Sequence, residues 1–334
     1  MLGSAHRIFG SADEYTQTIR AAHVQAAVLE PGQFAGELAR IDFRQLWLQR
    51  GSESLARSLH IYVPKQRSPI FFLTDSHQAA TRVNGIEFKP GDLLFWGAES
   101  EQYQRTDASI RWGTMSLEPE RLARAASAIL GYEISAPADT RVLRPNGIAM
   151  SRLATLHQMV GALARSSPNI FAHAQTSNAI EHTLVHAMLL AIDSGQEKEL
   201  GAGLRNRRAI LRDLEDLIAR NIARPLYLMD LCVALGTSER TLRRAFQEQL
   251  GISPNRYLWL RRMYLANRAL QLSAPVQASV TSIAMEHGFW ELGRFATAYR
   301  QLFGETPSIT LRKPPDFVPR TLPPSYRGLA HLDP

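Results

Sequence analysis

Between Leu231 and Pro307 the sequence repeats itself with an offset of 53 residues, and this repeat restricts the fold more than any other feature. Large apolar residues recur at the spacing i, i+4, i+8, which places them on one stripe of a helix. A glycine closes each stripe, as at a left-handed helix end, and a Ser-Pro or Thr-Pro pair then opens the next helix. The aligned pairs are Leu242 and Phe295, Phe246 and Tyr299, Leu250 and Phe303, Gly251 and Gly304, and Pro254 and Pro307. The region therefore contains one helical unit twice.

Each copy has the pattern of two helices joined by a tight turn, which is a helix-turn-helix unit. In the first copy, a short helix is predicted over Leu226 to Leu235, a turn at Gly236, and a second helix over Glu239 to Gln249 that Ser238 caps. In the second copy, the first helix contains Ile283 and Ala284, the turn contains His287-Gly288, and the second helix covers Leu292 to Leu302.

The second helix of each copy has a polar, mostly basic outer face. With the apolar stripes facing inward, the outward residues are Glu239, Arg240, Arg243, Arg244 and Gln247 in the first copy, and Glu291, Arg294, Thr297, Ala298 and Gln301 in the second, with Arg300 towards the edge. Such a face suits readout of base edges in the major groove of DNA. The alternative is a solvated face of an all-helical protein, which one such helix alone would fit equally well. Two of them in tandem favour DNA.

Between the copies, Pro254 to Gln271 is predicted to form one long helix. About eighteen residues at 1.5 Å each give roughly 27 Å, which is near the roughly 34 Å between successive major-groove faces of DNA. One chain could therefore bring both second helices to one side of a duplex. Arginines on the polar side of this connector are candidates for contacts with the DNA backbone, and they are Arg261, Arg262 and Arg268.

The repeat resembles the DNA-binding domain of AraC/XylS-type bacterial transcription regulators. The most specific motif runs from Ile283 through Gly288-Phe289 and Arg294-Phe295 to Pro307, and the first copy supports it between Leu231 and Pro254. The resemblance covers about residues 210–313, and it implies that Arg240, Arg244 and the positions around 292–297 face the bases. The residues expected in the interior and turns of the units are Leu231, Leu242, Phe246, Gly251, Ala284, Gly288, Phe289, Phe295, Tyr299, Phe303, Gly304 and Pro307.

Gly293 departs from the family pattern, which often has Ser ahead of the Arg-Phe pair. The stretch from Gly288 to Phe295 instead resembles a sub-group that includes ethanolamine-utilisation regulators. This departure bears on the base contacts of the second copy and leaves the expected fold unchanged.

The excess positive charge of the chain lies in the repeat-bearing region. The 334 residues have a net charge of +7, and residues 205–313 hold 17 Lys or Arg and 9 Asp or Glu, a balance of +8. The remainder is close to neutral, at −1. A polyanionic partner is therefore expected for this region alone. A membrane role is not expected, because no segment combines lysines with a bulky apolar face, and the single cysteine, Cys232, excludes an intramolecular disulfide.

Residues 14–117 contain short runs rich in β-branched and aromatic residues, with turn signals such as Asn84-Gly85 between them. Asn-Gly between two such runs predicts a hairpin, and many short strands with frequent turns predict an antiparallel barrel or sandwich. This half weakly resembles the cupin-type sensor domain that often precedes an AraC-type DNA-binding domain. Its aromatic residues are expected in the core, and the effector-binding residues are unknown. The runs are Ser58–Val63, Ile70–Leu73, Thr81–Val83 and Asp92–Trp96.

Helical periodicity follows, with helices predicted over Pro119–Leu130, Met150–Ala164 and Asn178–Ile192. In the family that the sequence resembles, helices at this position form the dimer contact; the alternative is that they pack on the sensor sheet. Gly195–Gly203 has the composition of a flexible linker, and six prolines after Lys313 predict an unstructured tail. The expected organisation is a sensor and dimerisation domain at 1–200, a linker at 201–209, a DNA-binding domain at 210–313 and a tail at 314–334.

Metal and enzyme chemistry find little support in the sequence. His182 and His186 lie four residues apart on one helical face, but no His-Glu-x-x-His pattern accompanies them. His60 and His77 are isolated, whereas a cupin enzyme would need a compact set of His and Glu ligands on the strands. No phosphate-binding loop and no nucleophile elbow occurs. No metal, cofactor or catalytic residue is therefore expected.

The sequence thus predicts an α+β protein of two domains: a β-rich, cupin-like barrel or sandwich with helices, then an all-α domain with two helix-turn-helix units joined by a long helix. The expected function is that of a cytoplasmic, dimeric transcription regulator, not an enzyme, with double-stranded promoter DNA, a small-molecule effector and RNA polymerase as partners. We classify the expected regulator as an activator, although the sequence does not distinguish activation from repression. Two alternatives stay open: a cupin-type enzyme with a helical protein-binding module, and an architectural DNA binder without an effector.

Overall fold

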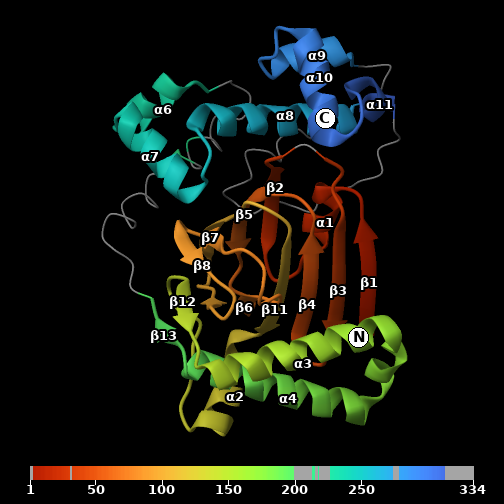
Figure 1. Ribbon diagram of the computed structural model, residues 1–334, viewed down its shortest axis with the longest axis vertical. Coiled ribbons are helices and arrows are strands. Elements are labelled where there is room, and N and C mark those ends of the chain that lie inside the picture. Colours follow the sequence, from red (N-terminus) through yellow and green to blue (C-terminus); the bar gives the residue numbers. More distant parts are fainter. Residues whose placement is uncertain are drawn as a thin grey trace. The chain divides into compact units, whose positions relative to one another are not determined.

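A β-rich region followed by a helical region makes up the chain, which confirms the coarse fold class. The computed structural model describes residues 3–30, 32–198, 213–214, 217, 226–273 and 278–312. Two compact units divide the chain, one comprising residues 1–26 and 34–200 and the other residues 27–33 and 201–334 (Figure 1). The linker predicted at 201–209 and the tail predicted at 314–334 lie outside the described residues.

Two antiparallel sheets form the frame of the first unit. The larger sheet has the spatial order β1-β3-β4-β11-β6-β9-β12-β13. Its strands are β1 (Gly3–Phe9), β3 (Gly36–Asp42), β4 (Trp47–Glu53), β6 (Ser68–Leu73), β9 (Leu93–Phe95), β11 (Ile110–Leu117), β12 (Arg141–Arg144) and β13 (Gln196–Glu197). The smaller sheet has the order β2-β5-β10-β7-β8. Its strands are β2 (His23–Val28), β5 (Arg57–Val63), β7 (Thr81–Val83), β8 (Ile86–Phe88) and β10 (Ser100–Thr106).

The centre of the larger sheet is buried on both faces, because this sheet is the middle layer of the unit. Along β6, Phe71 and Leu73 join an apolar cluster shared with Leu59 and other residues of the smaller sheet, while Ile70 and Phe72 join a second cluster shared with the helices. Successive side chains of a strand point to opposite faces. A middle layer therefore needs uninterrupted apolar runs, and this explains the run at residues 70–73.

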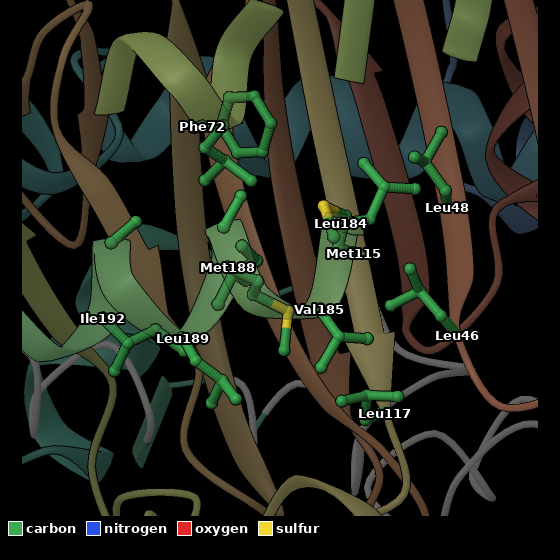
Figure 2. Packing of buried hydrophobic residues seen from close by; sticks show 14 of the residues in the cluster. Leu46, Leu48, Phe72, Met115, Leu117, Leu184, Val185, Met188, Leu189 and Ile192 are labelled. Carbon is green, nitrogen blue, oxygen red and sulfur yellow. The ribbon is translucent and has the colours of Figure 1, made fainter. Parts of the chain in front are cut away.

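Helices cover the outer face of the larger sheet (Figure 1). Leu184, Val185 and Met188 of α4 pack against strand residues that include Phe72 and Met115 (Figure 2). The Glu181 carboxylate fixes the same helix to the β3–β4 turn, because Oε1 accepts hydrogen bonds of 2.7 Å from the amides of both Gln45 and Leu46. The helices of this unit are α1 (Ala12–Thr18), α2 (Pro119–Leu130), α3 (Gly147–Ser166), the 3-10 helix η1 (Pro168–Ala172) and α4 (Ala174–Asp193).

Helix α3 packs closely on the larger sheet at His157, whose ring lies against Gly113 of β11. A Cβ at Gly113 would lie 2.6 Å from the His157 ring, so only glycine lets the helix come this near. The ring is fully buried and its Nε2 lies 3.1 Å from the Gln49 carbonyl oxygen. Burial, together with the charge of Arg50, lowers the pKa of His157 to about 3. The imidazole is therefore neutral at physiological pH and acts as a packing group.

Local turn and helix-end signals agree with the structure. Asn84 and Gly85 have positive φ values of 51° and 76° and join β7 to β8 in the predicted hairpin. Helix α2 ends at Gly131 in the left-handed conformation, as expected. The expected runs at 58–63, 70–73, 81–83 and 92–96 correspond to strands, whereas β1, β3, β4 and β11 carry no run recognised in the sequence.

The expectation of a flexible linker from Gly195 is wrong for its first residues. Gln196 and Glu197 form β13 and pair with β12. The Lys198 ammonium group lies 2.6 Å from the buried Asp92 carboxylate, which also pairs with Arg144 at 3.0 Å. These charge pairs hold residues 195–198 to the sheet, which composition alone does not reveal.

Candidate nucleic-acid interface

The first helix-turn-helix copy consists of α6 (Leu228–Ala234) and α7 (Glu239–Gln249). Gly236, in the turn, has a φ of 56°. The Ser238 hydroxyl accepts a hydrogen bond of 3.2 Å from the Thr241 amide and so caps α7. Leu242 and Phe246, predicted to face inward, are fully buried. The apolar stripe thus fixes which face of α7 points outward.

The outer face of α7 carries the predicted charged residues, and two of its arginines are paired. Every predicted residue, Glu239, Arg240, Arg243, Arg244 and Gln247, is exposed. The Arg243 guanidinium approaches Glu239 at 2.6 Å, and Arg244 pairs with Glu248 at 2.7 Å. The hydrogen bond and the charge of Glu248 raise the pKa of Arg244. Within the described part of the chain, Arg240 makes no ion pair.

The connector α8 (Pro254–Leu272) contributes to the cores of both copies. The Ser253 hydroxyl accepts from the Arg256 amide at 3.2 Å, and Pro254 occupies the first turn. Near its start, Tyr257 packs edge-to-face on Phe246 with 5.3 Å between ring centroids. Towards its end, Met263 belongs to the core of the second copy. Its 19 residues span about 28 Å, so one helix reaches from one copy to the other.

The second copy consists of α9 (Val280–Glu286) and α10 (Leu292–Phe303), followed by α11 (Pro307–Arg312). Its fully buried Tyr299 joins a chain of polar groups inside the core. The Asn267 amide donates to the Tyr299 hydroxyl at 2.6 Å, which donates to Thr310 Oγ1 at 2.9 Å. Thr310 in turn donates to the Glu305 carboxylate at 2.8 Å. The chain ties α8, α10 and α11 together.

The outer face of α10 differs from the prediction at one residue. Glu291, Arg294, Thr297 and Arg300 are exposed, as is Gln301. Ala298, however, is half-buried and packs against the core of the second copy. An alanine one position from Tyr299 lies at the border of the apolar stripe, and its small side chain fits against the core. The Arg294 guanidinium pairs with Glu291 at 2.9 Å.

The three connector arginines are all half-buried. Arg262 has a position inside the domain, because its Nη1 donates to the Gly288 carbonyl oxygen at 3.2 Å and its guanidinium lies 5.3 Å from the Phe289 ring centroid. Burial lowers its pKa. Arg262 therefore stabilises the turn between α9 and α10 through its hydrogen bond to Gly288. Arg261 and Arg268 also have partners within the protein.

The sequence interpretation missed Glu248, which the structure places beside a predicted base-contacting arginine. The signal was present, because an acidic residue four positions after an arginine lies on the same helical face.

The two histidines considered as metal ligands lie outside the helix-turn-helix copies, on α4, where His182 is exposed and His186 half-buried. Over the described residues, no three His, Cys, Asp or Glu side chains come together in a way that could hold a metal ion.

Comparison with known proteins agrees with this geometry. A family model described as a helix-turn-helix domain matches residues 231–313. The chain is 26% identical over 282 residues to the "Probable thc operon regulatory protein" of Rhodococcus erythropolis, covering 83% of this chain and 82% of that protein. It is 36% identical over 96 residues to the "XylDLEGF operon transcriptional activator" of Pseudomonas putida, covering 29% of this chain and 30% of that protein. The chain carries an AraC-type helix-turn-helix domain. This domain is the DNA-binding part of a transcription regulator.

Among solved structures, the AraC-like transcriptional activator CuxR is similar over 79% of this chain and 95% of that chain, with 14% sequence identity and a TM-score of 0.41. No helix among the described residues combines the length and the apolar character that a bilayer crossing requires.

Proposed function

We propose that the protein regulates transcription by placing α7 and α10 in successive major-groove segments of one promoter site. The observation that carries this proposal is the position of the two exposed, basic outer faces on copies that a single 19-residue helix joins. The base-contacting candidates are Glu239, Arg240, Arg243, Arg244, Gln247, Glu291, Arg294, Thr297 and Arg300. Arg261, Arg262 and Arg268 are backbone candidates, and Arg262 would reach phosphate only in addition to its contact with Gly288.

The proposed domain limits are those of the sequence: a sensor and dimerisation domain at 1–200, a linker at 201–209, a DNA-binding domain at 210–313 and a tail at 314–334. We assign the strand-rich part to the cupin type and the second copy to the sub-group resembling ethanolamine-utilisation regulators. The protein would act in the cytoplasm, contact RNA polymerase when bound to its promoter, and have no enzymatic activity of its own. The sub-group assignment rests on the sequence from Gly288 to Phe295 alone, because a Cβ at the exposed Gly293 would meet no atom within 4 Å and serine would fit there as well.

A small-molecule effector would bind between the two sheets of the first unit. Gln104 pairs with Leu59 across β10 and β5, and Leu59 belongs to the cluster between the sheets, so Gln104 also faces inward. Its amide nitrogen and the indole nitrogen of Trp96 are buried, and neither has a hydrogen-bond partner among the described residues. Buried donors without partners are uncommon in folded proteins. An effector with acceptor oxygens would satisfy them.

A homodimer would form through the exposed side of α3. Leu153 and Val160 of this helix face the sheet and are buried, whereas Ile148 and Met159 are 85% and 56% exposed. Most of each of these two side chains is thus left uncovered within the described part of the unit. Met159→Arg should therefore convert a dimer to a monomer that still unfolds in one cooperative transition, as measured by sedimentation equilibrium and calorimetry. A dimer that survives this change would remove α3 from the interface.

The direct test of the proposed function is selection of duplexes from a random library by the full-length protein. Enriched sequences should contain two short motifs about one helical turn apart. Contacts with about six phosphates per chain would make log affinity fall with log salt at a slope near −5, and approaching twice that for a dimer. A selection that enriches no sequence, combined with a shallow salt slope, would reject sequence-specific DNA binding.

A further inference from the structure

The arginines on the outer face of α7 are held by their carboxylate partners in two different ways. In Arg243, both Nε and Nη2 approach Glu239 Oε1 at 2.6 Å. In Arg244, Nε alone donates to Glu248 Oε1, at 2.7 Å. Within the described residues, the terminal nitrogens of Arg244 donate no hydrogen bond. The two side chains therefore offer different parts of the guanidinium group to an outside ligand.

This difference matters for the recognition of guanine. An arginine reads guanine by donating two parallel hydrogen bonds to O6 and N7. The guanidinium has five N–H donors in a planar fork, so a group held at Nε keeps its Nη1 and Nη2 end available for that pair of bonds. A group engaged at both Nε and Nη2 must first leave its carboxylate. Arg244 is thus oriented for readout, and Arg243 is restrained.

Glu248 is placed to hold this orientation. Its side chain is 29% exposed, whereas the Arg244 side chain is 69% exposed, so the carboxylate is the more fixed partner of the pair. The four-residue spacing on α7 puts both side chains on the same helical face. In the second copy the arrangement is different, since Arg294 meets Glu291 through its terminal Nη1 at 2.9 Å. Among the arginines that pair with a carboxylate on α7 and α10, Arg244 is therefore the one whose closest contact is made by Nε and not by a terminal nitrogen.

We propose that Glu248 is a positioning residue for base readout, holding Arg244 by Nε so that the two terminal nitrogens face a guanine. The inference rests on the proposed DNA-binding function and adds to it a residue that does not touch the base. It also assigns the contacted base, because a two-donor fork with no acceptor matches only the O6 and N7 pair of guanine.

The experiment uses the full-length protein, the duplex that it selects from a random library, and a shuffled duplex of the same length. Glu248→Gln keeps the shape of the side chain and removes its charge. Glu239→Gln is the matched control, because Glu239 also pairs with an arginine four residues away on α7. Each guanine of the selected duplex is replaced in turn by 7-deazaguanine, which lacks the N7 acceptor. The readouts are the ratio of affinities for the two duplexes and the loss caused by each replacement.

Loss of the carboxylate charge should tighten binding of the shuffled duplex in both variants, because one negative charge near the phosphates is removed. In Glu248→Gln the ratio of selected to shuffled affinity should also fall, by about 3- to 10-fold, since part of a bidentate contact is lost. The penalty for 7-deazaguanine should shrink at one guanine only. Glu239 is itself a base-contact candidate, so its variant is judged by one readout alone: in Glu239→Gln the penalty at the guanine that Glu248→Gln affects should stay as in the wild type.

Three outcomes would overturn the inference: an unchanged ratio in Glu248→Gln, a reduced penalty at the same guanine in Glu239→Gln, or a fall in the ratio that persists when Arg244 is already alanine. Each of them presupposes a wild-type protein that prefers its selected duplex. A wild type that binds both duplexes equally would instead reject the proposed function, so the two failures are distinguishable.

Discussion

The two helix-turn-helix copies follow one backbone plan and are stabilised by different side chains. With the 53-residue offset, Ser238, which caps α7, corresponds to Glu291, which makes no capping hydrogen bond and pairs with Arg294 instead. Phe246, fully apolar, corresponds to Tyr299, whose hydroxyl joins a buried polar chain. The shared spacing of apolar residues therefore gives both copies the same backbone fold, and the two copies differ in their polar interactions.

The difference also separates two sources of stability. The first copy depends on its cap and on Leu242 and Phe246, whereas the second adds hydrogen bonds that connect α8, α10 and α11. Buried polar chains stabilise a fold only while every member has its partner. The second copy should therefore be the more sensitive of the two to small changes in its interior.

The largest effect is expected from Phe295→Ala. Phe295 is buried between Phe289 and Tyr299, with ring centroids 4.9 Å and 5.6 Å away. Truncating it should lower the free energy of unfolding of this unit by roughly 3–5 kcal/mol. Urea unfolding followed by circular dichroism measures the change, and Thr297→Ala, on the exposed face of the same helix, is the control. Wild-type stability in Phe295→Ala would show that Phe295 is not in the core.

A smaller effect should follow from Tyr299→Phe, which gives the second copy the aromatic residue of the first. The substitution keeps the ring and removes one hydroxyl, leaving the Asn267 amide without its acceptor and Thr310 without its donor. Such a loss costs about 1–3 kcal/mol. The matched change is Tyr257→Phe, at a half-buried tyrosine beside the first copy, which should cost less. Equal costs in calorimetry would remove the proposed difference between the cores.

Two glycines of the second copy should respond in opposite directions. Gly304 ends α10 with a φ of 76°, where a Cβ is strained, so Gly304→Ala should destabilise by about 1 kcal/mol. Gly293 lies in the first turn of the same helix with open space around it, so Gly293→Ala should stabilise by less than about 1 kcal/mol. Thermal unfolding of both variants measures the signs. The same sign for both would contradict the assigned backbone conformations.

The accuracy of the sequence-based prediction differs between the two halves for a physical reason. The predicted bounds of α7 agree with the structure, and those of α10 differ only by Phe303, because caps, helix-ending glycines and apolar spacing are local signals. In the β-rich half, β1 and β3 were missed. Their pairing joins residues that lie more than 25 positions apart, such as Phe9 and Gly36, and no local pattern reports it.

Side-chain partners show the same division. The exposure of Arg240 and Arg244 follows from helical periodicity once Leu242 and Phe246 face inward. The hydrogen bond of 3.0 Å that Trp112 donates to the buried Glu53 carboxylate depends on β4 and β11 being neighbours. The contact of Arg262 with the Gly288 carbonyl oxygen likewise joins residues of two helices whose packing the sequence does not state.

The smallest expected effect is a pH dependence confined to the second copy. His287, at the end of α9, corresponds to Ala234 in the first copy, and its burial lowers its pKa below the usual 6.5 despite the opposing charge of Glu286. The folded state therefore favours the neutral imidazole, so its contribution is complete above about pH 6.5 and is lost as pH falls through the lowered pKa. An NMR titration of the imidazole signals, assigned with His287→Ala, should give a midpoint below 6.5. In the wild type, amide exchange in α9, corrected for the intrinsic exchange rate, should depend on pH between that midpoint and 6.5. In His287→Ala this dependence should disappear, and the amides of α6 should behave alike in both proteins. A midpoint at or above 6.5 would mean that the turn of the second copy is open to water, and the two copies would then respond alike to acid.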